Sequence, residues 1–238
     1  MNNEQAAMAM QGSAAWHLAR LGHITSSQVY KLMGKGRAKD AEFSQTGISY
    51  LLEIAAERNL KDSYINDDMA FQDYLDRVNA SSKAMRYGTE TEPVARKVYA
   101  AKHKELRIEE CGFVRSGYHS DVQIDKYGDS PDGLCADSNT GEIVGCIEIK
   151  CPMPNTWMAY RYGFKSGKTL KEVEEAYYWQ CQSHCLCNNV QWCDFIFFDK
   201  MQKNGFQCIR VERNDEDIKL MVDKIQKANK FIDDLLNE

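Results

Sequence analysis

Residues 142–151 alternate between apolar and polar side chains, and this alternation limits the possible folds more than any other feature of the chain. The apolar positions share one side of an extended strand: Ile143, Gly145, Ile147 and Ile149. Successive side chains of a strand point to opposite faces, so the other face carries Glu148 and Lys150. Residues 137–141 have the composition of a turn, and the region 121–150 is therefore predicted to form a hairpin within a sheet.

Other segments show helical or strand periodicity. Helices are predicted at 26–33, 48–59, 85–102, 170–186 and 215–236, and further strands at 108–116, 121–127, 193–200 and 205–212. The last helix has an apolar stripe formed by Ile218, Met221, Ile225, Ala228, Ile232 and Leu235. This order of elements predicts an α/β (α+β) fold with a central mixed sheet and flanking helices.

The chain has 238 residues and shows neither a Pro/Ser-rich linker nor an internal repeat, so a single domain spanning 1–238 is expected. Partial disorder is expected over residues 1–12, and the C-terminal helix is expected within 214–238. The chain has no apolar run near the roughly 18–20 residues that a membrane helix needs, and the N-terminus lacks the pattern of a signal peptide. A cytoplasmic protein is therefore expected.

The net charge of −5 argues against a protein that coats nucleic acid over its whole surface. It is compatible with basic residues confined to one channel. The nine cysteines are odd in number, and reduced thiols are the expected state. Within 181–193 several cysteines have helical core spacing, which favours buried thiols over a cysteine-ligated iron–sulfur cluster.

Asp132, Glu148 and Lys150 form the most informative pattern for chemistry. Glu148 and Lys150 project to the same side of their strand, and the hairpin can bring Asp132 beside them. Carboxylate oxygens hold Mg²⁺, which lowers the pKa of bound water and offsets charge on a phosphate. Lysine can position the attacking water or neutralise the transition state. The trio therefore indicates metal-dependent phosphodiester hydrolysis.

Five ordered motifs carry a resemblance to a known family. Pro131-Asp132 and Glu148-x-Lys150 match the PD-(D/E)xK nuclease signature, and their extensions 130–135 and 148–152 resemble the lambda-exonuclease (YqaJ-type) recombinases. An N-terminal W-x-x-x-R-x-G-x-I-T-x-S motif runs from Trp16 to Ser27. A G-x-x-x-E motif ends at Glu92, and a Y-x-x-Q-x-Q motif comprises Tyr177, Gln180 and Gln182.

The resemblance implies a role for each matching residue. Asp132, Glu148 and the carbonyl of Ile149 would hold Mg²⁺, with Mn²⁺ as a possible substitute, and Lys150 would be the catalytic lysine. Glu92 and Gln180 would act at the same site. The residues assigned to binding DNA and its 5′-phosphate are Arg20, Ser27 and Tyr177. Taken alone, Glu92 and Gln180 fit exposed helix positions, Arg20 fits a surface ion pair, and Ser27 fits a helix cap.

The family also implies a reaction and partners. A 5′–3′ exonuclease of phage origin is expected to act on double-stranded DNA with free ends. It is expected to form a homotrimeric ring and to work with a single-strand annealing protein. The alternatives are an endonuclease or an exonuclease of the other polarity, and a DNA-binding module with a decayed site. Asp129 departs from the family pattern and is either a supporting partner of the metal site or a solvated turn residue.

Overall fold

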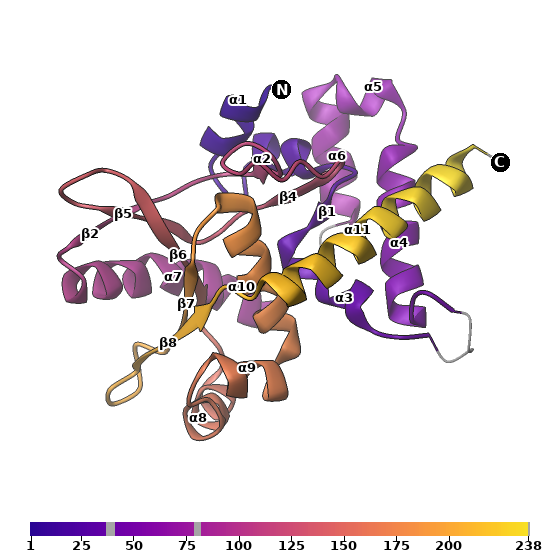
Figure 1. Cartoon of the computed structure of the whole chain (residues 1–238). Helices are drawn as coiled ribbons and strands as arrows, with labels where there is room; N and C mark the ends of the chain where they lie inside the picture. The colour runs from indigo at the N-terminus through magenta and orange to yellow at the C-terminus, as the bar shows by residue number, and fades with distance from the viewer. Residues whose placement is uncertain (37–40, 79–81, 238) are drawn as a thin grey trace.

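The computed structural model describes residues 1–36, 41–78 and 82–237. Its central sheet has five strands in the order β2 (Leu106–Glu109), β5 (Gly133–Asp137), β6 (Ile143–Lys150), β7 (Trp192–Phe198) and β8 (Phe206–Glu212). β6 and β7 are parallel, and the other neighbours are antiparallel. The prediction of a mixed central sheet is therefore confirmed (Figure 1).

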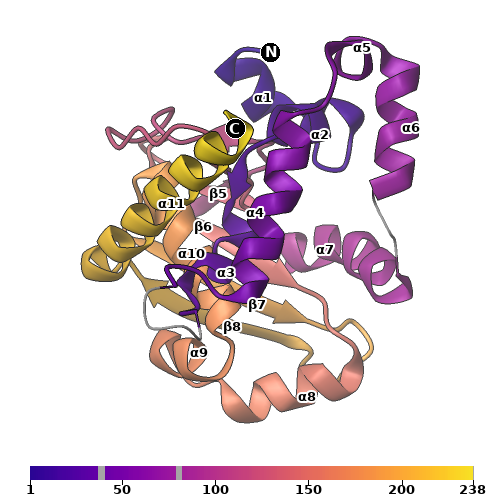
Figure 2. The ribbon, with the colours of Figure 1, turned by 90° about the vertical axis from the view of Figure 1, so that its right-hand side faces the viewer.

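A second, smaller sheet contains β1 (Ile24–Thr25), β4 (Tyr127–Asp129) and β3 (Val114–Arg115), with β4 in the middle. The flanking helices are α1 (Asn3–Met8), α2 (Ala14–Arg20), α3 (Tyr30–Met33), α4 (Gln45–Arg58), α5 (Asp62–Ile65), α6 (Asp68–Val78), α7 (Lys83–Lys102), α8 (Pro154–Gly163), α9 (Gly167–Val173), α10 (Glu175–Asn188) and α11 (Asp215–Leu236). In Figure 2, α8 and α9 lie at the opposite end of the molecule from α1 and α5. None of the described helices is long and apolar enough to cross a membrane.

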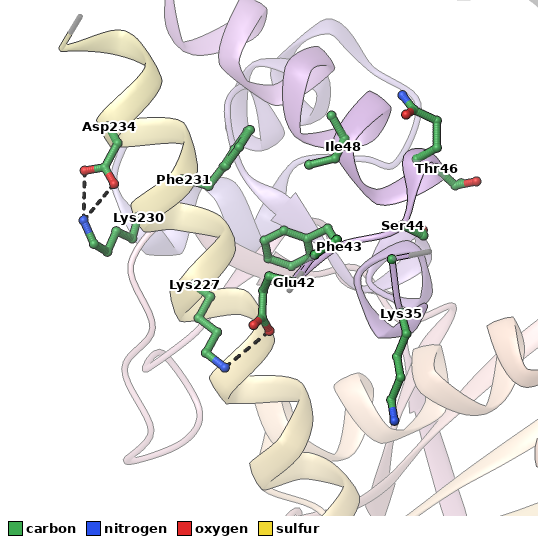
Figure 3. A pocket seen from close by; sticks show the side chains of 13 residues that line it. Lys35, Glu42, Phe43, Ser44, Thr46, Ile48, Lys227, Lys230, Phe231 and Asp234 are labelled. Carbon is green, nitrogen blue, oxygen red and sulfur yellow. Dashed lines mark hydrogen bonds and ion pairs between the residues drawn. The ribbon is translucent and has the colours of Figure 1, made fainter. Parts of the chain in front are cut away.

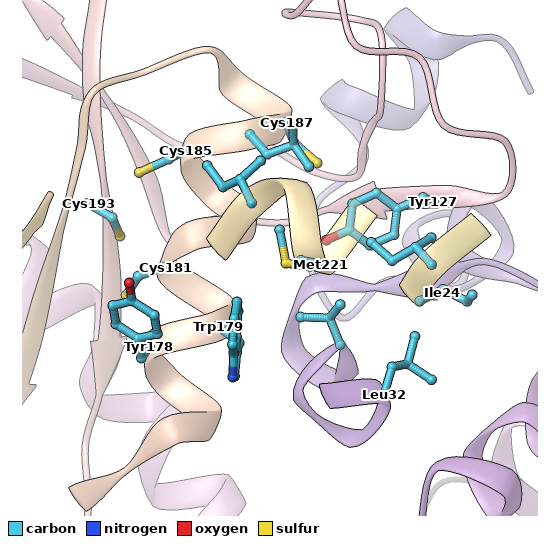
Figure 4. Packing of buried hydrophobic residues seen from close by; sticks show 14 of the residues in the cluster. Ile24, Leu32, Tyr127, Tyr178, Trp179, Cys181, Cys185, Cys187, Cys193 and Met221 are labelled. Atoms are coloured by element: carbon cyan, nitrogen blue, oxygen red, sulfur yellow. The ribbon is translucent and has the colours of Figure 1, made fainter. Parts of the chain in front are cut away.

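The central sheet lies between α7 and α10 because both of its faces are apolar. On one face, Ile147 and Ile149 of β6 pack against Ala95 and Tyr99 of α7. The other face belongs to the main core, whose members around α10 include Trp179, Cys181, Cys185, Cys193 and Met221 (Figure 4). Burial of each large apolar side chain contributes about 1.5–3 kcal/mol. All four cysteines of the 181–193 segment are buried in this core, as predicted, and all are free thiols.

The C-terminal helix α11 runs beside α4 in Figure 1 and buries the predicted stripe from Ile218 to Ile232. Leu235 was also assigned to the stripe, but its side chain is 37% exposed. The helix extends past the end of the core at that point. The helix predicted at 170–186 is two helices, α9 and α10, because Glu174 between them has a non-helical backbone.

The strand predicted at 108–116 is instead two short strands in different sheets, β2 and β3. Between them, the backbone N–H groups of Gly112 and Phe113 donate to the carbonyls of Ala7 and Ala6, at 2.6 and 2.8 Å. The segment 1–12, expected to be partly disordered, therefore contains helix α1 and fixes this loop. The strand predicted at 121–127 begins only at Tyr127.

Candidate active site

The turn before β5 brings Asp132 against the end of β6. The backbone N–H of Asp132 donates to the carbonyl of Ile147 at 3.1 Å. The Asp132 carboxylate accepts a hydrogen bond from the N–H of Ile149 at 2.6 Å. The strand β5 starts only at Gly133, so the N–H of Ile149 in β6 has no backbone carbonyl of β5 opposite it. The side chain of Asp132 accepts that hydrogen bond instead. The predicted approach of Asp132 to Glu148 and Lys150 is thus present in the structure.

Glu148 and Lys150 lie on the α10 face of β6, opposite to Ile147 and Ile149. Their side chains form an ion pair in which Glu148 is 1% exposed and Lys150 is 29% exposed. The Lys150 ammonium also lies 5.3 Å from the centre of the Tyr177 ring, a cation–π contact. Tyr177, expected among the DNA-binding residues, therefore contacts Lys150. It stacks on Phe195 with a centroid distance of 5.2 Å.

Helix α7 contributes Glu92 and a second residue, Arg96, that the sequence did not single out. Arg96 pairs with Glu92 at 2.6 Å and with Glu110 at 2.8 Å, and its Nε donates to the carbonyl of Asp132 at 2.8 Å. This guanidinium joins α7 to the turn that carries Asp132. The spacing of Glu92 and Arg96, four residues apart on a helix, is the signal that could have revealed the pair.

Gln180 and Gln182 of the Y-x-x-Q-x-Q motif have different surroundings. Gln182 is buried and bonds to the carbonyl of Glu212 and the N–H of Asn214, both at 2.8 Å, so it fixes the junction of β8 and α11. Gln180 is also buried rather than exposed, and no side-chain hydrogen bond to it is recorded within the described part of the chain. Its proposed catalytic role stays a prediction.

A buried hydrogen-bonded chain, which the sequence motifs do not predict, lies behind Glu148. His184 of α10 contacts Glu148 Oε2 through Nε2 at 2.7 Å and Asp129 Oδ1 through Nδ1 at 2.6 Å. Asn188 donates to the other Asp129 oxygen at 2.8 Å. Asp129 is fully buried, so it is not a solvated turn residue. His184 follows Gln180 by one helical turn, and that spacing was the available signal.

The surroundings of the two predicted metal carboxylates, Asp132 and Glu148, shift their pKa values in opposite directions. Burial raises the pKa of Asp132 well above its usual range, and the nearby charges of Glu148 and Glu92 raise it further. Burial alone would raise the pKa of Glu148 too, but Lys150 and His184 outweigh burial and lower it. Burial likewise raises the pKa of Glu92, against the opposing charge of Arg96. The centre therefore has an excess of carboxylates, which a cation would relieve.

Oxygen donors of this kind suit a hard divalent cation such as Mg²⁺, which is commonly held by one or two carboxylates. In the part of the chain that the structure describes, no group of three or more His, Cys, Asp or Glu side chains has a geometry that could hold a metal ion. Glu148 is engaged by Lys150 and His184, and Asp132 by Ile149. The residues fit a site of two carboxylates completed by other oxygens.

Arg20 lies at the end of α2, and its guanidinium stacks on Trp16 at 3.9 Å from the ring centre. Burial lowers the pKa of Arg20 to about 10, and Tyr50, Glu57 and Asp129 oppose the shift. Within the described residues this guanidinium has no ion pair and no side-chain hydrogen bond, so the alternative of a surface ion pair finds no partner among them. Ser27 lies close by in sequence, with its hydroxyl 3.5 Å from that of Thr25.

Arg20, Glu92 and Asp132 line one cleft of about 990 Å³, together with Trp16, Tyr50, Glu57 and Arg96. A cavity of about 900 Å³ elsewhere lies between α11 and residues 41–48 (Figure 3). Its lining contains none of the predicted site residues, and Lys227 and Lys230 are paired there with Glu42 and Asp234. The candidate active site is therefore the first cleft together with Glu148 and Lys150, which lie behind Asp132 and are not part of the cleft lining.

Comparisons with known proteins identify the family and the fold. The family model of the YqaJ-like viral recombinase domain matches residues 15–191. An alkaline exonuclease from Laribacter hongkongensis superposes with a TM-score of 0.71 at 26% identity, over 94% of this chain and 95% of that one. The same enzyme in complex with dAMP gives a TM-score of 0.72, with the same identity and coverage.

A phage-related exonuclease from Haemophilus somnus 129PT shares the fold, with a TM-score of 0.56 and 15% identity over 90% of this chain and 95% of that one. No curated protein sequence matches the chain. The structural likeness extends beyond the matched segment 15–191 to nearly the whole chain.

Proposed function

Because the chain belongs to the YqaJ-like viral recombinase domain family, we propose that it is a metal-dependent 5′–3′ exonuclease. It would degrade one strand of linear double-stranded DNA and leave 3′ single-stranded tails for annealing. The observation that carries the proposal is the meeting of Asp132, Glu148 and Lys150 beside a cleft that also contains Arg20. The superposed relative from Laribacter is an alkaline exonuclease.

Asp132 and Glu148 would hold the cation, Mg²⁺ or Mn²⁺, together with the backbone carbonyl of Ile149. In a strand the N–H and C=O groups of one residue point to the same side, and the N–H of Ile149 already bonds Asp132. When bound, the cation would supply Lewis-acid stabilisation of the phosphate and a water of lowered pKa. Glu92, held by Arg96, would orient a water, and Gln180 would act beside it.

Lys150 keeps its charge next to these carboxylates. Burial alone would lower its pKa, but Glu148 and Asp132 outweigh burial and raise it. The ammonium is confined between Glu148 and the face of Tyr177. We therefore assign Lys150 to orienting the attacking water and to neutralising charge that develops on the phosphate.

The Arg20 end of the cleft would hold the 5′-phosphate of the cut strand, with help from Ser27. A half-buried guanidinium that stacks on Trp16 and has no carboxylate partner among the described residues favours an anionic ligand, because its N–H groups can pair with phosphate oxygens. Stacking on Trp16 fixes the plane of the guanidinium and leaves its N–H groups for phosphate oxygens. An end-binding pocket suits an exonuclease and has no use in an enzyme that cuts within a strand.

The proposal includes the wider setting that the family resemblance implies. The protein would be of phage origin, would act in the cytoplasm as a homotrimeric ring, and would deliver its single-stranded product to an annealing protein. Sedimentation of the purified protein, with and without DNA, tests the ring. A monomer in both conditions would remove the homotrimer from the proposal.

The decisive experiment uses linear duplex DNA labelled at a 3′ end and carrying either a 5′-phosphate or a 5′-hydroxyl. Wild type with Mg²⁺ is expected to consume the phosphorylated strand from its 5′ end. Lys150→Ala and an EDTA control are expected to be inactive. Equal reaction of both ends would contradict the phosphate pocket, and cutting of circular DNA would indicate an endonuclease. Binding without cleavage would indicate a decayed DNA-binding module.

A further inference from the structure

Six side chains, from His119 to Lys150, form a continuous polar chain through the main core. His119 contacts Asn188 at 3.2 Å, Asn188 bonds Asp129, and Asp129 bonds His184, which reaches Glu148. Glu148 in turn pairs with Lys150. The side chains of Asp129 and His184 are 0% exposed, and that of Glu148 is 1% exposed.

A buried chain of charged and polar side chains is unfavourable in free energy compared with an apolar core. Moving charged groups out of water costs several kcal/mol each, and well-packed apolar side chains of similar volume are often as stable or more stable. His184 lies within the main core, whose members on α10 include Cys181, Cys185 and Leu186. Packing alone therefore gives no reason for a histidine here, and a reason must come from what it contacts.

The geometry shows what His184 contributes to Glu148. Neither Asp129 nor Glu148 has a hydrogen to offer when ionised, so both ring nitrogens of His184 donate. Glu148 then has one oxygen directed at His184 and the other at Lys150. These two contacts on opposite oxygens fix the rotation of the carboxylate, and Asp129 with Asn188 fixes the ring that provides one of them.

We propose that His184, oriented by Asp129, is a positioning residue that holds the Glu148 carboxylate in the orientation required to bind the divalent cation. This inference rests on the proposed function, because it takes Glu148 to be a metal ligand. His184 itself would touch neither the cation nor the DNA. Supporting hydrogen bonds of this kind typically change metal affinity by about 10–100-fold when they are removed.

Two substitutions of His184 separate positioning from packing. The amide nitrogen of glutamine is as many bonds from Cα as Nε2, so His184→Gln keeps a donor for Glu148. The amide nitrogen of asparagine corresponds to Nδ1, so His184→Asn keeps a donor only for Asp129. Both variants lose one buried hydrogen bond and leave one carboxylate partly unsatisfied. Similar losses of melting temperature are therefore expected for the two.

The measurement is Mn²⁺ binding to the DNA-free protein, by calorimetry, with melting temperature recorded on the same samples without metal. His184→Asn is expected to weaken Mn²⁺ binding by about 10-fold or more, and His184→Gln to stay within about 3-fold of wild type. Wild-type affinity in His184→Asn would overturn the inference. So would equal weakening in both variants, because a purely structural role predicts that result.

Glu148→Gln distinguishes failure of this inference from failure of the proposed function. If Glu148→Gln binds Mn²⁺ as wild type does, Glu148 is not a ligand, and both proposals fall. If Glu148→Gln loses binding while both His184 variants keep it, only the positioning inference falls. Should the His184 variants not fold, Asn188→Ala decides in their place. It is expected to weaken Mn²⁺ binding by about 2–5-fold, and unchanged affinity would overturn the inference.

Discussion

Two charged regions of the molecule, the carboxylate centre and the Arg20 end of the cleft, differ in how their charges are balanced. At the carboxylate centre, Asp129, His184, Glu148 and Lys150 alternate in sign and contact one another. At the other end, the Arg20 guanidinium stacks on Trp16, and its pKa is lowered by burial to about 10.

This contrast separates a region whose charges are satisfied within the protein from a region whose charge is available to a ligand. A chain of alternating charges is satisfied before any ligand arrives, so it can hold a geometry. A guanidinium without a recorded protein partner, within the described residues, gains its partner only when an anion binds. The first region suits chemistry, and the second suits recognition of a DNA end.

The largest expected effect comes from the carboxylate that faces the cleft. Asp132→Asn keeps an oxygen for the Ile149 N–H but removes the charge that would bind the cation. Exonuclease activity in single-turnover assays is expected to fall by about 10³-fold. Stability should be unchanged or higher, because burial disfavours the charged carboxylate. Asp137→Asn, at the half-buried end of β5 and outside the cleft lining, is the matched control. Activity of Asp132→Asn within tenfold of wild type would contradict the assignment.

A smaller and more selective effect is expected at Arg20. Arg20→Ala should slow digestion of 5′-phosphorylated DNA by about 10–100-fold, the loss expected for a bidentate charge-assisted contact. Digestion of 5′-hydroxyl DNA should change little. The rate of Arg20→Lys on 5′-phosphorylated DNA should lie between those of wild type and Arg20→Ala, because lysine keeps the charge without the planar guanidinium. An equal loss on both substrates would mean that Arg20 supports the fold rather than the phosphate.

His23, which lines the same cleft as Arg20, allows a test by pH. Burial lowers the pKa of His23 to about 4, with its Nδ1 3.0 Å from the carbonyl of Leu21. A lowered folded-state pKa gives stability that is fully present above pH 6.5, the usual value, and is lost as the pH falls toward 4. The expected loss is about 2 kcal/mol, allowing for partial exposure.

Urea unfolding of wild type and His23→Gln across this pH range measures the effect. Wild type is expected to lose about 2 kcal/mol more than the variant between pH 6.5 and 4. Parallel curves would show that His23 titrates normally. In that case the Arg20 end of the cleft is wetter than its geometry indicates, and the contrast with the carboxylate centre weakens.

The smallest expected effect is stabilisation by a free anion. Inorganic phosphate at ten times its dissociation constant should raise the free energy of unfolding of wild type by about 1.4 kcal/mol. The gain should vanish in Arg20→Ala and persist in Lys150→Ala. Loss of the gain in Lys150→Ala alone would place the phosphate at the carboxylate centre, and the comparison of the two regions would need to be reversed.

The local features of this protein follow from short patterns in its sequence. The period-2 pattern of 142–151 is sufficient to predict β6 and to place Glu148 and Lys150 on one face. The buried stripe of α11 follows from helical spacing alone. The motifs around Asp132 and Arg20 indicated the family, which the match over 15–191 confirmed. Each of these signals is contained within a few turns or one strand, where side-chain direction depends only on local backbone geometry.

Which of these elements meet depends on the packing of the folded chain. The parallel pairing of β6 with β7 places α10 over β6, and this brings His184 to Glu148, 36 residues away in sequence. Tertiary packing also brings Asp129 to His184, and it brings α1 to the loop near Gly112, whose backbone α1 holds. Burial and hydrogen-bond partners depend on contacts between distant segments, and no local pattern records them. For that reason a histidine without a motif became the centre of the buried network.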